Sequence, residues 1–131
     1  CHPILSDRTA LEVYPALIAR WARANGYKND NRQRQSDQQA ANRRTIIDAV
    51  KSDTFADQYG FAVSVNREVV RAALADPTGD TLDAVLCVLQ AAWAWNQRLN
   101  GWGIPAGADS LEGWIVDPHQ RSNNAGVHAV S

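Results

Sequence analysis

The stretch Asp80–Trp95, DTLDAVLCVLQAAWAW, decides the fold that this sequence predicts, because it has the pattern of one long apolar helix. Asp80 and Asp83 place two carboxylates in the first turn of that helix. Asp83, Cys87 and Gln90 recur at helical spacing, so we expect Asp83 to lie near the buried face. A helix with acids at its start is one half of many metal-dependent phosphoryl-transfer sites, and the other half is an acid on a strand.

A candidate for that strand lies near the start of the chain, in LEVYPA at Leu11–Ala16. Ala10–Tyr14 has the composition of a short buried strand that Pro15 ends, and it carries Glu12. EGWIV at Glu112–Val116 predicts a final short strand. Two strands so far apart in the sequence make a poor sheet, so we expect the first strands of the sheet to be missing from this chain.

The remaining pattern predicts an α-rich α/β fold. We expect helices at Ala16–Ala24, at Ser36–Val50, within Ser64–Ala75 and from Asp80 to about Gln97. Asp53–Ala62 has a mixed pattern that Gly60 interrupts, and Asn100–Asp109 is predicted to be a loop. Residues 1–131 are expected to form a single domain or the C-terminal portion of one, with a polar tail at 119–131.

Composition restricts the class of protein. The chain has 131 residues, 45% of them hydrophobic and 21% charged, which is ordinary for a globular domain. No window of about 20 apolar residues and no signal-peptide pattern occurs, so no membrane partner is expected. Cys1 and Cys87 need not pair, which favours a cytoplasmic location. An N-terminal Cys1 nucleophile is an alternative for which no nearby oxyanion site is visible.

Charge is unevenly distributed along the chain. Arg20–Arg44 contains seven basic residues and two acidic ones, although the whole chain carries a net charge of −1. Such an asymmetry can steer a polyanion to one face of a protein. A solvated surface of helices and loops explains the same asymmetry without any ligand.

The acids allow two interpretations. Glu12 on a strand and Asp83 on a helix would together form an oxygen site suited to Mg²⁺ or Mn²⁺. Helix capping alone also explains Asp80 and Asp83, and Glu12 can equally lie on an exposed face or pair with an arginine. The histidines show no zinc-ligand spacing, and no phosphate-binding or dinucleotide-binding glycine motif occurs.

Four short blocks together resemble a known family. They are LEVYPA at Leu11–Ala16, GYK at Gly26–Lys28, the Asp80–Trp95 stretch and EGWIVDP at Glu112–Pro118. In this order they resemble the predicted RNase H-like nucleases known as domain of unknown function 429. The resemblance implies an RNase H-like fold, a mixed sheet flanked by helices. The family's first strand has no counterpart before LEVYPA, so the chain resembles the C-terminal part of such a protein.

The resemblance implies roles for particular residues. Glu12 matches the acid of the central strand, and Asp83, with Asp80 close by, matches the acid of the last helix. Our first hypothesis is that the parent protein is a metal-dependent nuclease, incomplete in this chain, in which Glu12 and Asp83 bind the metal and Asp80 is an auxiliary ligand or a cap. Lys28 with Arg43 or Arg44 would then hold phosphates of the nucleic acid.

The competing hypothesis is a non-catalytic module that keeps the same scaffold to bind protein or nucleic acid. A carboxylate covered by Arg or Lys would favour this second hypothesis. Because the predicted sheet is incomplete, we also expect self-association or pairing with a missing N-terminal segment.

Overall fold

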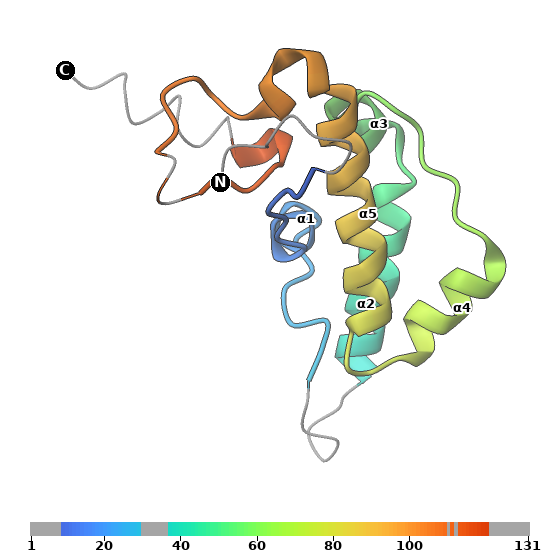
Figure 1. The fold of residues 1–131 in the computed structure, drawn as a ribbon. Helices are drawn as coiled ribbons and strands as arrows, with labels where there is room; N and C mark the ends of the chain where they lie inside the picture. Colours follow the sequence, from blue (N-terminus) through green and yellow to red (C-terminus); the bar gives the residue numbers. More distant parts are fainter. Residues whose placement is uncertain (1–8, 30–36, 110, 112, 121–131) are drawn as a thin grey trace. The chain divides into compact units, whose positions relative to one another are not determined.

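The computed structural model of this chain describes residues 9–29, 37–109, 111 and 113–120 (Figure 1). The chain divides into two compact units. One consists of Pro15–Leu86 and is called the helical unit here; the other combines Cys1–Tyr14 with Cys87–Ser131 and is called the terminal unit. Helix α5 (Asp80–Asn96) passes through the boundary between Leu86 and Cys87 and contributes residues to both units.

The helical unit is organised around one amphipathic helix. Its elements are α1 (Ala16–Trp21), α2 (Asp37–Val50), α3 (Asp53–Tyr59), α4 (Arg67–Ala75) and the first part of α5 (Figure 1). Helix α2 packs against both α3 and α4. Its Ile46, Ile47 and Val50 are almost completely buried, as their spacing predicts. These apolar contacts hold the unit together, since exposing such side chains costs about 1.5–3 kcal/mol each.

Helix α3 occupies part of the stretch whose sequence pattern is mixed. Ser52 caps it, because the Ser52 hydroxyl accepts a hydrogen bond from the Phe55 amide at 3.2 Å. Gly60 ends it in the left-handed conformation, with φ 81°. Between these signals Phe55 and Tyr59 are buried and their rings stack at 4.0 Å between centroids. Gly60 is therefore the end of a helix rather than an interruption.

The terminal unit contains the second half of α5 and the 3-10 segment η2 (Arg98–Gly103). The chain turns sharply at the end of η2, where Gly101, Trp102 and Gly103 all have positive φ. A β-carbon at Gly103 would lie only 2.4 Å from the Trp93 ring. Glycine is thus required there both for the backbone conformation and for the close approach of the indole.

The two predicted strands meet at a single point in this unit. Glu12 and Ile115 form an isolated parallel bridge, and the Val116 amide donates to the Glu12 carbonyl at 2.9 Å. Two residues further along, Tyr14 does not continue the pairing: its amide donates to the Gln90 side chain at 2.8 Å, and its carbonyl accepts from the same side chain at 3.0 Å. A glutamine of α5 therefore takes the hydrogen bonds that a neighbouring strand would make.

The predicted α/β fold with a sheet is wrong for the described part of the chain, which is helical with one isolated bridge and no strand. The physical reason lies at Tyr14 and Pro15. The main-chain groups of Tyr14 bond to a side chain, and α1 begins directly after Pro15, so the extended run is too short to form a ladder. The strand-like composition marks extended chain here, not a sheet.

Several predictions fall on residues outside the described ranges: the Cys1 nucleophile, Ser36 at the start of a predicted helix, Glu112 at the start of the predicted strand, and residues 121–131 of the polar tail. In the part of the chain that the structure does describe, no helix combines the length and the apolar character needed to cross a bilayer.

Candidate functional site

The acid that the sequence singles out on α5 lies in a small polar cluster of the helical unit. The Tyr27 hydroxyl donates to one Asp83 carboxylate oxygen at 2.5 Å, and the Lys28 ammonium contacts the other at 2.6 Å. The Asp83 side chain is 21% exposed and that of Lys28 46%, so the cluster opens to solvent. GYK and DTLDAV, two blocks separated by more than fifty residues, are therefore brought together through these three side chains.

Glycines and a backbone hydrogen bond place Lys28 beside α5. Gly26 turns the chain with φ 76° after α1. The Asn29 amide then donates to the Pro77 carbonyl at 3.2 Å, which ties the segment to the turn before α5. A β-carbon on Gly79 would lie 2.7 Å from the Lys28 β-carbon. The absence of a side chain at Gly79 thus permits the approach of Lys28 to Asp83.

The first turn of α5 is stabilised by Asp76, not by Asp80. The Asp76 carboxylate accepts hydrogen bonds from the Thr78 hydroxyl at 2.6 Å and from the Thr81 amide at 2.9 Å. These bonds, led by that of the Thr78 hydroxyl, hold the pKa of Asp76 well below its ordinary value. Asp80 is exposed, which leaves its carboxylate in solvent.

The two arginines predicted to hold phosphate have opposite surroundings. Arg43 is 5% exposed, and its guanidinium donates to the Tyr27 carbonyl at 2.9 Å and to the Leu74 carbonyl at 3.1 and 3.3 Å. Arg44 is exposed on α2. Since the donors of Arg43 serve main-chain carbonyls, Arg44 and Lys28 are the cations of the predicted set that face solvent.

Glu12 belongs to the terminal unit, and its side chain is exposed. Its main chain makes the bridge to Ile115, while Asp83 lies in the helical unit, so a metal site shared by Glu12 and Asp83 stays a prediction. Within residues 9–29, 37–109, 111 and 113–120, no group of three or more His, Cys, Asp or Glu side chains is placed to hold a metal ion together.

A buried network in the terminal unit was not predicted from the sequence. Asp117 is completely buried and accepts hydrogen bonds from the Gln90 amide group at 2.8 Å and the His119 main-chain amide at 2.8 Å. The His119 ring nitrogen Nδ1 lies 3.0 Å from the same carboxylate. Two signals point to it in retrospect: a glutamine inside the apolar run of α5, and an acid directly before Pro118.

The hydrogen bonds of Gln90 and Asp117 give both residues a structural role. Gln90 bonds to the Tyr14 main chain and to Asp117, so it joins α5 to both extended segments. A buried carboxylate needs such partners, because its desolvation otherwise costs several kcal/mol.

Comparison with protein-family models, with curated proteins and with solved structures gave no match.

Proposed function

We propose that this chain supplies a metal-binding carboxylate and phosphate-binding cations to a divalent-metal-dependent phosphodiesterase that hydrolyses nucleic acid. One observation carries the proposal. Asp83, an acid in the first turn of α5, lies at a solvent-open position with a lysine on one oxygen and a tyrosine hydroxyl on the other. The blocks that carry these residues are among those on which the resemblance to predicted nucleases rests.

In this proposal Asp83 binds Mg²⁺ or Mn²⁺, Glu12 is the second ligand that the resemblance implies, and Asp80 is an auxiliary acid. The metal would stabilise charge on the transferring phosphoryl group and activate water. Tyr27 orients the Asp83 carboxylate through its hydroxyl. Lys28, whose side chain is 46% exposed, leaves Asp83 for a phosphate oxygen when a cation takes its place. A cytoplasmic location is part of the proposal, supported by a chain with only two cysteines.

A non-catalytic module is the second candidate, and the same cluster favours it in one respect. The Lys28 ammonium already neutralises Asp83, and Tyr27 holds the other oxygen. In that arrangement Asp83 is a tie between α5 and the segment after α1, with no need for a metal. The two candidates therefore differ in one respect: in the nuclease Lys28 competes with a metal ion for Asp83, whereas in the module no metal ion binds there.

Titration with Mn²⁺, followed by electron paramagnetic resonance, separates the candidates. Under the nuclease proposal, Asp83→Asn weakens Mn²⁺ binding, while Lys28→Gln strengthens it by removing a competing cation. Asp48→Asn is the matched control, because Asp48 is an exposed acid on α2 that has no role in the proposal. Both Asp83→Asn and Lys28→Gln should abolish Mn²⁺-dependent cleavage of labelled DNA or RNA, single- or double-stranded.

The module candidate predicts a different outcome. Lys28→Gln and Asp83→Asn would then lower the free energy of unfolding by similar amounts, and the double variant would lose no more than either one, because each removes the same ion pair. If this pattern appears together with unchanged Mn²⁺ binding and no cleavage by the wild type, the nuclease proposal fails.

A further inference from the structure

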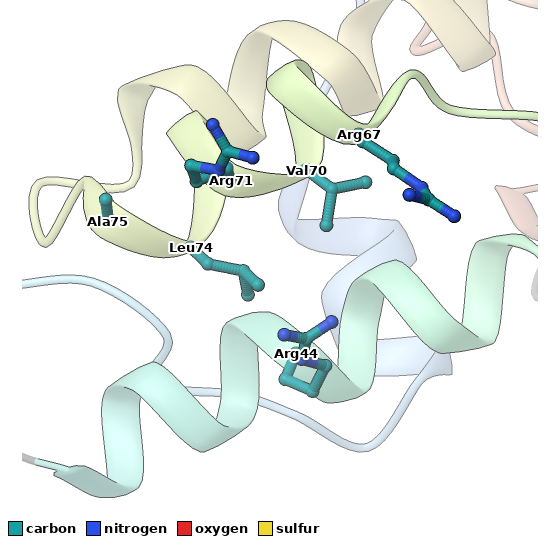
Figure 2. A pocket seen from close by; sticks show the side chains of 6 residues that line it. All are labelled: Arg44, Arg67, Val70, Arg71, Leu74 and Ala75. Carbon is teal, nitrogen blue, oxygen red and sulfur yellow. The ribbon is translucent and has the colours of Figure 1, made fainter.

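A groove of about 480 Å³ lies between α2 and α4 in the helical unit, and arginines dominate its polar surface. The residues that line it are Arg44, Arg67, Val70, Arg71, Leu74 and Ala75 (Figure 2). Arg44 reaches from α2 toward α4, and Leu74 reaches from α4 toward α2 (Figure 2). All three arginines are exposed, whereas Val70 and Leu74 are partly buried and form an apolar floor.

The three guanidinium groups are not neutralised within the described part of the chain. No hydrogen bond or ion pair joins Arg44, Arg67 or Arg71 to a described residue, and no acidic side chain lines the groove. Arg67 and Arg71 are four residues apart on α4, a spacing at which like charges repel and destabilise a helix slightly. An anionic ligand that bridges them would relieve this repulsion.

The chemistry of the lining favours a phosphate backbone as the ligand. Guanidinium groups match phosphate oxygens in a bidentate geometry. No aromatic ring is among the lining residues, so the groove offers no platform on which a base would stack. Phosphate contacts of this kind hold a nucleic acid in place without reading its sequence.

We propose that this groove binds the sugar-phosphate backbone of nucleic acid through Arg44, Arg67 and Arg71, as a site separate from the Asp83 cluster. The inference rests on the proposed function for its choice of nucleic acid over an acidic protein. Structural continuity supports that choice: the buried guanidinium of Arg43 bonds to the carbonyl of Leu74, which lines the groove, and to that of Tyr27, which holds Asp83. The groove and the acid are thus fixed relative to each other within one unit.

Binding of a fluorescein-labelled single-stranded oligonucleotide, measured by fluorescence anisotropy in EDTA, tests the groove without any metal or cleavage. Three phosphate contacts predict that the logarithm of the binding constant falls with the logarithm of salt concentration with a slope of about −2. Each of Arg44→Gln, Arg67→Gln and Arg71→Gln should weaken binding roughly three- to tenfold and reduce the slope by about 0.7. Lys51→Gln is the matched control, because Lys51 is exposed just after α2 and outside the groove.

Two results would overturn the inference. One is a triple arginine variant, folded by circular dichroism, that binds the oligonucleotide as tightly as the wild type does. The other is polyglutamate that binds through the same arginines as tightly as the oligonucleotide, which would assign the groove to acidic proteins. The proposed hydrolysis can fail separately. Arginine-dependent binding without any cleavage would support the groove and refute the hydrolysis. Cleavage with a KM that the arginine variants do not change would support the hydrolysis and refute the groove.

Discussion

Arg43 and Arg44 show how much one position in a helix changes the role of the same side chain. Arg43 points inward and bonds to two main-chain carbonyls, while Arg44 points outward into a groove. Adjacent residues of a helix lie about 100° apart around its axis, so one can be buried while its neighbour is exposed. The sequence alone does not tell which of two arginines finds carbonyl partners, because those partners lie far away in the chain.

Replacement of each arginine by leucine measures this difference. Arg43→Leu should lower the free energy of unfolding by about 2–3 kcal/mol, because the carbonyls of Tyr27 and Leu74 lose their donors in a buried setting. Arg44→Leu should change it by less than about 0.5 kcal/mol, since the side chain is exposed. Urea denaturation of both variants checks the prediction, and equal effects at the two positions would contradict it.

Asp76 gives a second prediction at the scale of a residue. Asp76→Ala removes the acceptor for the first turn of α5 and should cost about 1 kcal/mol near neutral pH. The pKa of Asp76 is depressed in the folded chain, so its contribution is fully present above the unfolded pKa of about 3.9. That contribution is lost as pH falls below about 4 toward the depressed value.

Denaturation of the wild type and Asp76→Ala from pH 7 down to pH 2 tests the sign of this effect. The gap in stability between the two proteins should be constant from pH 7 to about pH 5 and should then shrink. Asp80→Ala is the control, because Asp80 is exposed at the same helix start. A gap that widens on acidification would show that the Asp76 carboxylate is not stabilised in the folded state.

At the scale of an element, two glycines of η2 separate the cost of a backbone conformation from the cost of a steric clash. Gly101 and Gly103 both have positive φ, but a β-carbon meets nothing within 4 Å at Gly101 and lies 2.4 Å from Trp93 at Gly103. Gly101→Ala should therefore cost about 1–2 kcal/mol. Gly103→Ala should cost about 1–3 kcal/mol more, because the indole must move.

Thermal unfolding of the two glycine variants gives these differences directly. The near-ultraviolet circular dichroism of Gly103→Ala should also change, because Trp93 is almost completely buried against this turn. The spectrum of Gly101→Ala should resemble that of the wild type. Similar stabilities for the two variants would mean that the turn at Gly103 adapts without displacing the ring.

The helices were largely predictable from local signals, and the errors have local causes. The expected ranges of α2, α4 and α5 agree with the structure within a few residues, because periodic apolar residues end at clear turn signals such as Pro77 and Gly79. Helix α3 was missed because Gly60 was read as a break inside the segment. The pairing of Lys28 with Asp83 was not predicted, although both residues were selected, since the sequence does not record which distant groups meet.

At the scale of the whole molecule, the prediction of a sheet failed because it was drawn from the composition of two short runs. The run at LEVYPA does become extended, but its hydrogen bonds pass to one bridge and to the Gln90 side chain. The original reason for expecting self-association, an open sheet edge, therefore has no basis in the described residues. A different feature supports the same prediction.

Large apolar side chains are exposed in the second half of α5 and in η2. Val88 is 66% exposed, Trp95 56% and Leu99 93%. Val88 and Trp95 are seven residues apart on α5 and so lie on one helical face, and Leu99 follows in η2. Apolar surface arranged in such a stripe marks a site of protein association more often than scattered exposed residues do.

We therefore predict that this chain associates with a second copy of itself through the stripe of Val88, Trp95 and Leu99. Sedimentation velocity should show an average mass that rises with protein concentration, and Val88→Asp with Leu99→Asp should suppress the rise, because a charge on the stripe cannot be buried cheaply. Val69→Asp is the control, since Val69 is 39% exposed but lies on α4 in the other unit. A monomeric mass at every concentration would contradict the prediction. So would an association that Val88→Asp with Leu99→Asp does not weaken, because the stripe would then not be the surface that joins two copies.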